Sequence, residues 1–235
     1  MPSNEPPGDA RPESVVEYTI TTLREAIRDG RFAPGQRLVV SDVTRRLGVS
    51  AGPVREAIRR LTGEGLVEIR PHRGALVKEY TAQELADIFN LREVVEGLAA
   101  RLAACRVQFG DYRARMTQLL EEMREETEAM RGAYVDQNHT FHLLIYEMAG
   151  SPRIAEIAAS LVLPIYSLRF HQRISQSYSK VSYGEHVAIA QAILRGHGPG
   201  AERAMRRHIR NSGEAMTRAL QDDPPLRTHP TPNGH

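Results

Sequence analysis

The chain has 235 residues and is nearly neutral, with 31 Lys and Arg against 29 Asp and Glu and a formal net charge of +2. This length is sufficient for two domains, each with its own core. No stretch approaches the roughly 20 consecutive apolar residues that a membrane-spanning helix needs, and the polar, proline-rich start has no signal-peptide core. We therefore expect a cytoplasmic protein that does not engage a membrane.

The two ends of the chain differ in composition from the rest. Residues 1–13 and 221–235 are rich in Pro, Asp, Asn and Gly. Such segments bury too little apolar surface to offset the entropy of folding, so both are predicted to be disordered tails. Between them, residues 14–80 and 81–220 follow different patterns, and we interpret them as two domains.

The first domain opens with two predicted helices. Apolar residues recur at helical spacing from Val16 to Ile27, and Gly30 follows as a stop signal. A second, short helix is predicted from an N-cap at Ser41, and Gly48 supplies the left-handed residue that ends it. The glycine predicts a sharp turn into the next helix.

The third predicted helix has the pattern of a DNA-reading element. Ser50 is its expected N-cap, and Pro53 is tolerated in the first turn, where no intrahelical donor is needed. Val54, Ile58 and Leu61 recur at i, i+4 and i+7 and predict the face that packs on the core. The remaining surface is partly cationic, which suits a helix that enters a major groove.

A β-hairpin is predicted directly after this helix. Residues 66–70 alternate like a strand, residues 71–74 have turn chemistry, and residues 75–79 can return as the partner strand. His72 and Arg73 lie at the tip of the turn. Helix, hinge, helix and hairpin in this order predict a winged helix-turn-helix domain over residues 14–80.

Charge is unevenly distributed between the two domains. Residues 14–80 carry 12 Lys and Arg against 8 Asp and Glu, whereas residues 81–220 carry 17 against 16. A small helical domain with a solvated basic face is the simpler alternative. The coincidence of hinge, apolar stripe and hairpin favours phosphate contact by the first domain.

The same residues carry a resemblance to a known family. The runs PG-RL, LGVS, PVREA and EGLV…P-RGA-V resemble the N-terminal domain of the GntR family of bacterial transcription regulators. One departure concerns the start of the recognition helix, where the family usually has Ser-Arg-Thr-Pro and this chain has Ser-Ala-Gly-Pro. A usual DNA-contacting arginine is therefore missing, and the operator of better-known relatives does not carry over. The resemblance leaves as DNA-binding candidates Arg45, Arg46, Ser50, Gly52, Arg55, Arg59, His72 and Arg73.

The second domain is predicted to be an all-α antiparallel bundle, which makes the whole chain mainly α. Helix-period stripes predict helices at 81–105, 111–130, 134–149, 152–175, 183–195 and 200–220, and no segment alternates like a strand. Short glycine-containing breakers favour antiparallel neighbours. The lone cysteine, Cys105, cannot form an internal disulfide and is expected to be a small buried apolar residue.

Four polar residues of this domain suggest a metal site. Asn138 and His142 are one turn apart on one predicted helix, while His186 and His208 lie on two others. Three neutral imidazoles from separate helices are the ligand set of a closed-shell divalent ion with an open position for water or a carboxylate. Spacing alone does not establish the site, because a lone histidine is more often a core or surface residue than a ligand.

A second resemblance bears on these residues. The segments NHTFHLLIYEMAGSPRI, GEHVAIAQAILRG and AERAMRRHI resemble the FCD effector domain of the FadR branch of the GntR family. It implies that Asn138, His142, His186 and His208 hold zinc or nickel beside a small organic acid. Asparagine stands where aspartate is frequent, and because an amide adds no charge, the ion would attract an anionic ligand more strongly and bind less tightly itself.

Arg92 is the predicted effector-binding residue. It matches an arginine that is typical of the first FCD helix, where it could grip the carboxylate of an effector with two hydrogen bonds. The alternative is a surface ion pair with Glu96, one turn further along the same helix.

These observations lead to one functional hypothesis and two alternatives. We expect a homodimeric transcription regulator whose affinity for a palindromic operator changes when an organic acid binds at the metal. Most relatives are repressors, so repression is the expected mode of regulation. In one alternative, zinc or nickel is itself the signal. In the other, the chain is a metal-dependent enzyme acting on a carboxylate, which is disfavoured because no carboxylate is placed beside the ligands as a general base.

Overall fold

The structure is a computed structural model that describes residues 14–129, 133–166 and 176–222. The tail predicted for residues 1–13, and the part of the other tail from residue 223 onward, lie outside this range. Gln221 and Asp222, predicted to be in the C-terminal tail, form the end of the last helix. The chain divides after Lys78 into two compact units, which are described separately.

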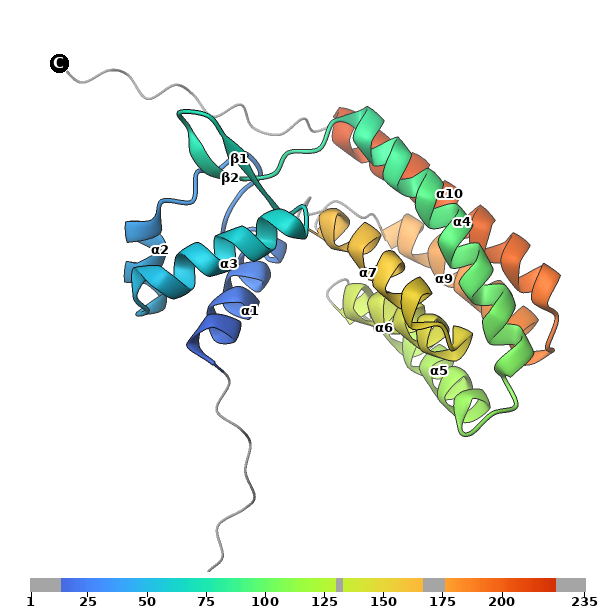
Figure 1. Ribbon diagram of the computed structural model, residues 1–235. Helices are drawn as coiled ribbons and strands as arrows, with labels where there is room; N and C mark the ends of the chain where they lie inside the picture. Colours follow the sequence, from blue (N-terminus) through green and yellow to red (C-terminus); the bar gives the residue numbers. More distant parts are fainter. Residues whose placement is uncertain (1–13, 130–132, 167–175, 223–235) are drawn as a thin grey trace, which may run out of the picture. The chain divides into compact units, whose positions relative to one another are not determined.

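The N-terminal unit is a winged helix-turn-helix, as predicted. Three helices are followed by one antiparallel hairpin, in which Val67 pairs with Val77 and Arg70 with Gly74 (Figure 1). Leu23, Val54 and Leu61 are fully buried between the helices. The elements are α1 (Val15–Arg28), α2 (Val40–Leu47), α3 (Ala51–Gly63), β1 (Val67–Arg70) and β2 (Gly74–Val77).

Local details of this unit differ from the prediction at its capping residues. Ser41 is not the N-cap of α2, because Val39 already accepts the first helical hydrogen bond, from the backbone N–H of Val43 at 3.0 Å. Gly48 ends α2 with a φ of 67°, as its left-handed position requires. Ser50 occupies the N-cap of α3, but its side chain makes no cap hydrogen bond. At the tip of the hairpin, His72 has a φ of 60°, so the turn places a residue with a side chain in the left-handed region.

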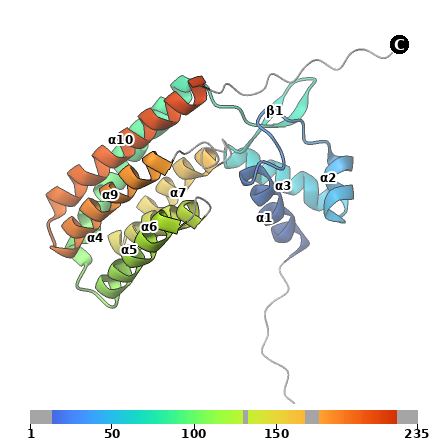
Figure 2. The same cartoon turned by 180° about the vertical axis from the view of Figure 1, so that it is seen from behind.

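The C-terminal unit is a bundle of helices, with no strand among its described residues (Figures 1 and 2). The helix predicted for 152–175 reaches Tyr166, and residues 167–175 lie outside the described range. The helix predicted to start at Tyr183 already begins at Gln176. None of the described helices has the length and apolar character needed to cross a membrane. The helices are α4 (Ala82–Arg106), α5 (Tyr112–Ala129), α6 (Ala133–Ala149), α7 (Pro152–Tyr166), α9 (Gln176–Leu194) and α10 (Gly198–Asp222).

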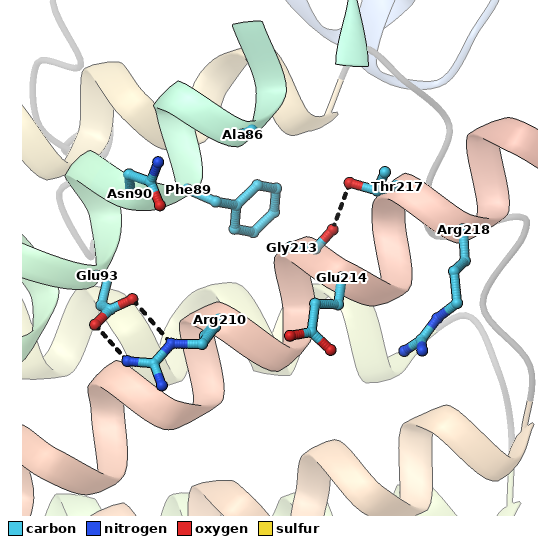
Figure 3. A pocket seen from close by; sticks show the side chains of 9 residues that line it. All are labelled: Ala86, Phe89, Asn90, Glu93, Arg210, Gly213, Glu214, Thr217 and Arg218. Atoms are coloured by element: carbon cyan, nitrogen blue, oxygen red, sulfur yellow. Dashed lines mark hydrogen bonds and ion pairs between the residues drawn. The ribbon is translucent and has the colours of Figure 1, made fainter. Parts of the chain in front are cut away.

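Helix α4 is the central element of the bundle and packs against α6, α7, α9 and α10. Thr81 begins it with a capping box, in which Thr81 and Glu84 satisfy each other's backbone N–H groups. Its contacts with α10 run in opposite order along the two helices: Phe89 meets Gly213, and Glu93 pairs with Arg210 at 2.7 Å (Figure 3). The two helices are therefore antiparallel.

Cys105 is exposed, so the prediction that it is a small buried apolar residue is wrong. Ala103 and Ala104 are buried in the core. Along an α-helix, the direction of the side chain rotates by about 100° from one residue to the next. Cys105 therefore points away from the interior that its two neighbours occupy. Its sulfur lies 3.8 Å from where a side chain at Gly198 would begin.

Glycine at position 213 allows α4 and α10 to approach closely. A Cβ there would lie 2.8 Å from Cγ of Phe89, whereas a Cβ at Gly184, inside α9, would meet nothing within 4 Å. We expect Gly184→Ala to stabilise the protein by about 0.5–1 kcal/mol through helix propensity. Gly213→Ala should be about 1–3 kcal/mol less stable than that control, because Phe89 must move. Urea unfolding of both variants measures the difference, and equal stabilities would contradict the close contact.

Candidate functional site

Three histidines from three helices meet inside the C-terminal bundle. His142 on α6, His186 on α9 and His208 on α10 are at most 3% exposed, and each offers a ring nitrogen within 4.8 Å of the others. The centroids of the His186 and His208 rings are 4.4 Å apart, and that of His142 lies 5.6 and 5.4 Å from them. The convergence expected from the sequence is thus present.

The donor set has the chemistry of a divalent-metal site. Ligand nitrogens about 2.1 Å from a tetrahedral zinc ion are roughly 3.4 Å apart, so small ring rotations would bring these three nitrogens to coordinating distance. Burial, with the nearby His208 and His142, lowers the pKa of His186 well below its usual value. Burial also lowers the pKa of His208. Both rings are therefore held as neutral imidazoles, the form that binds metal, and the three histidines could hold an ion.

Two carboxylates stand directly behind the histidines. Oε2 of Glu96, on α4, lies 2.6 Å from Nδ1 of His142, and Oε2 of Glu185 lies 2.8 Å from Nδ1 of His208. An ionised carboxylate only accepts hydrogen bonds, so each Nδ1 carries the proton and each Nε2 is left as the ligand atom. The sequence placed no carboxylate beside the histidines as a general base, and the two that the structure brings there bond to ring nitrogens. They orient the rings.

Arg92 is buried beside Glu96 and connects to the histidine cluster through it. Its Nε donates to Oε1 of Glu96 at 2.6 Å, and its guanidinium carbon lies 5.0 Å from the centroid of the Phe89 ring. The ion pair between Arg92 and Glu96 was the alternative to an effector-binding role for Arg92. The pair is not on the surface, however, because the side chains of Arg92 and Glu96 are 8% and 0% exposed. Burial tends to raise the pKa of Glu96, yet Arg92 and His142 together outweigh burial and lower it.

Asn138 is half-buried on α6, one turn before His142. Its part as a fourth ligand remains a prediction.

The predicted DNA-binding residues of the N-terminal unit are all exposed. Arg55 and Arg59 on α3 line a concave surface together with Arg37, which precedes α2. Arg59 also forms a bidentate pair with Glu56, with its Nε 2.9 Å from Oε2. His72 and Arg73, at the tip of the hairpin, directly precede Gly74 and Ala75, which also line this surface.

Three residues of these sites were missed by the sequence reasoning. Glu96 was considered only as a surface partner of Arg92, although its i+4 spacing was visible. Glu185 directly precedes His186, but it serves His208 on another helix, and no local pattern shows such a contact. Arg37 lies within the PG-RL run, and an isolated β-bridge to Leu76 and backbone hydrogen bonds from the neighbouring Gly35 and Leu38 hold this run against the hairpin.

An exposed basic winged helix-turn-helix, followed by a helical bundle with an internal polar cluster, defines a DNA-binding transcription regulator. The family model for bacterial regulatory proteins of the gntR family matches residues 17–77, and the FCD domain model matches residues 87–211. The chain belongs to the GntR family and carries an FCD domain, as its sequence motifs indicate. Because members of this family are transcription regulators, the enzyme alternative is wrong.

Characterised relatives and solved structures are similar over most of the chain. The HTH-type transcriptional repressor RspR of Escherichia coli K12 is 26% identical over 205 residues, which cover 86% of this chain and 88% of that protein. A probable D-xylose utilization operon transcriptional repressor of Paenarthrobacter nicotinovorans is 26% identical over 81% of this chain and 87% of its own length. The structure of E. coli McbR/YncC has a TM-score of 0.75 at 21% identity and covers 87% of this chain and 98% of that one. A GntR regulator from Rhodococcus sp. RHA1 has a TM-score of 0.69 at 26% identity, with coverages of 86% and 97%.

Glu96 should strengthen metal binding without touching the ion. We expect Glu96→Gln to lower the affinity for zinc by about 10- to 100-fold, because the neutral amide no longer raises the basicity of His142. Glu93→Gln is the matched control, since Glu93 lies on the same helix and pairs with Arg210 at the surface. Competition with a chromophoric chelator measures both affinities. Equal zinc affinity in the two variants would contradict the assigned contact.

Proposed function

We propose that this protein is a homodimeric cytoplasmic repressor that binds a palindromic operator and responds to a small organic acid. The acid would bind at a zinc or nickel ion held by His142, His186 and His208, with Asn138 as the fourth protein ligand. The observation that carries the proposal is the buried cluster of three imidazoles, two of them oriented by carboxylates. Such a cluster leaves coordination positions open for a further ligand.

The charges around the cluster favour an anion as that ligand. A divalent ion would add two positive charges beside the guanidinium of Arg92, while Glu96 and Glu185 supply two negative ones. The ion, Arg92, Glu96 and Glu185 together leave one positive charge over, and Arg207, whose charge also acts on Glu185, adds to the excess. A bound carboxylate would reduce that excess, and uncompensated charge in a protein interior is costly.

Arg92 is suited to hold the acid next to the ion. Its Nε is bonded to Glu96, and a guanidinium has five N–H donors, which can serve a second carboxylate with the geometry that such groups prefer. Because Glu96 also contacts His142, the arginine and the metal ligand share one carboxylate. This arrangement supports Arg92 as the residue that recognises the effector.

Repression and its release would follow from linked binding. Two of the relatives are described as transcriptional repressors. For the acid to change operator affinity, it must bind the DNA-competent arrangement of the protein and the alternative arrangement with different affinities.

A metal-responsive regulator is the second candidate, because the neutral buried imidazoles are suited to bind metal with or without an acid. Chelator titration against operator binding, in the absence of any organic acid, separates the two. A change in operator affinity would favour the ion as the signal.

The histidines should be required for metal binding and not for DNA binding. We expect His142→Ala and His208→Ala to retain no zinc after dialysis, while affinity for the bare operator changes little, since the two sites lie in different units. His197→Ala is the control, because His197 is exposed and directly precedes α10. Mass spectrometry of the metal content and a DNA-binding titration provide the measurements. Unchanged zinc content in both variants would disprove the site.

Arg55 should contact the operator through the concave surface of the N-terminal unit. We expect Arg55→Ala to weaken binding to an operator recovered by in vitro selection by about 1–3 kcal/mol if it reads a base. Arg153→Ala, an exposed arginine on α7, is the control. A variant that loses discrimination against random duplex marks a base contact, whereas a uniform loss with a smaller salt dependence marks a phosphate contact. Unchanged affinity would exclude Arg55 from the interface.

A further inference from the structure

Helix α4 carries large apolar side chains on the face that turns away from the core of the bundle. Leu91, Val94 and Leu98 are 56%, 53% and 42% exposed, whereas Leu85 and Phe89 of the same helix are buried. Single exposed apolar residues are common on protein surfaces, but a contiguous stripe of them is typical of a surface that another protein covers. The outer face of α4 therefore calls for a partner.

The spacing of these residues is that of a helix that pairs with a second helix. Steps of three and four residues alternate along them, which is the repeat of a coiled-coil contact. The repeat continues at both ends, to Asp87 four residues before Leu91 and to Arg101 three residues after Leu98. Asp87, Leu91, Val94, Leu98 and Arg101 are called here the α4 seam, which is about 21 Å long at the rise of an α-helix.

The two ends of the α4 seam carry opposite charges at equal distances from its middle. Asp87 and Arg101 are both exposed, and each lies seven residues, or about two helical turns, from Val94. In a two-fold symmetric contact between identical antiparallel helices, each end of one seam meets the other end of its copy. Asp87 of one copy then meets Arg101 of the second copy, whereas a parallel pairing brings like charges together, which is unfavourable.

The contacts of the two charged residues within the chain leave them able to form these pairs. Asp87 accepts a hydrogen bond from Gln83, one turn earlier on α4, at 3.0 Å. One guanidinium nitrogen of Arg101 lies 3.6 Å from a carboxylate oxygen of Glu202, and the Arg101 side chain is still 56% exposed. Because a guanidinium has five N–H donors, Arg101 can keep Glu202 and also bind a second carboxylate.

We propose that the α4 seam is the surface through which two copies of this chain form a dimer, with their α4 helices antiparallel and crossing near Val94. The inference rests on the proposed homodimer and names its surface. The apolar middle of each seam covers that of the other copy, and an Asp87–Arg101 pair closes the contact at both ends. Such a contact is complete with two copies, which matches the two half-sites of a palindromic operator.

Leu98→Lys tests the apolar middle of the α4 seam in the full-length protein. We expect it to weaken dimerisation by about 100-fold or more, because the contact would bury an ammonium group against apolar side chains of the second copy. Leu143→Lys is the matched control, since Leu143 lies on α6 and is 43% exposed. Size-exclusion chromatography with light scattering measures the mass over a range of concentrations. Melting temperatures show whether both variants are folded.

Cysteine cross-linking tests the orientation of the two helices. In a Cys105→Ser background, Val94→Cys should give a covalent dimer with a short bis-maleimide, because the axes of packed helices are about 8–10 Å apart. The unaltered protein should give none, since antiparallel pairing near Val94 sets its two Cys105 residues roughly 30 Å apart. Gln118→Cys, at an exposed position of α5, is the control in the same background.

Exchange of the charges tests the ends of the α4 seam. Asp87→Arg and Arg101→Asp should each weaken the dimer by about tenfold, because each places like charges opposite one another. The double variant should regain most of that loss, since its pairs are opposite in charge again. A double variant weaker than both single variants would overturn the pairing of Asp87 with Arg101.

The outcomes separate this inference from the proposed function. A dimer that persists in Leu98→Lys, or that does not cross-link through Val94→Cys, would overturn the α4 seam and leave a homodimer with another surface. Cross-linking of the unaltered protein through Cys105 would overturn the antiparallel arrangement. If the unaltered protein is a monomer both free and bound to operator DNA, the α4 seam and the proposed homodimer fall together.

Discussion

The C-terminal bundle depends on one buried carboxylate, that of Glu96, which contacts Arg92 with one oxygen and His142 with the other. A charged group in a protein interior is tolerated only with partners that neutralise it. Arg92 neutralises Glu96, and the Nδ1–H of His142 donates to its other oxygen, so the carboxylate joins helices α4 and α6. The position of a histidine in the cluster is thereby tied to the position of the arginine that the proposed function assigns to the effector.

The packing of α4 makes this arrangement possible. Helix α4 contacts four other helices, and small residues such as Ala99, Ala100 and Ala103 bring them close. Gly213 on α10 admits the ring of Phe89, which in turn lies against Arg92. A core of larger side chains would hold the helices further apart, and the hydrogen bonds between α4 and α6 would lengthen.

The sequence predicted most of the fold and the histidine cluster, and it failed where contacts cross between helices. The hinge at Gly48 and the apolar stripe of α3 are local signals, and both are present in the structure. The i+4 spacing predicted the pairing of Arg92 with Glu96, but one helix alone does not show that its exposed-looking face is covered by neighbours. Glu185 and Arg37 meet partners that only the tertiary fold brings near. Cys105 was misplaced because a run of apolar neighbours does not identify which side of a helix faces solvent.

The shared carboxylate has a consequence for how such a regulator would behave in a cell. Glu96 contacts both His142 and Arg92, so under the proposed function occupancy of the ion site and affinity for the acid would be linked, and linkage acts in both directions. Under the proposed function, the acid would be registered only when the ion site is occupied. Genes under its control would then respond to the combination of acid and metal rather than to either alone.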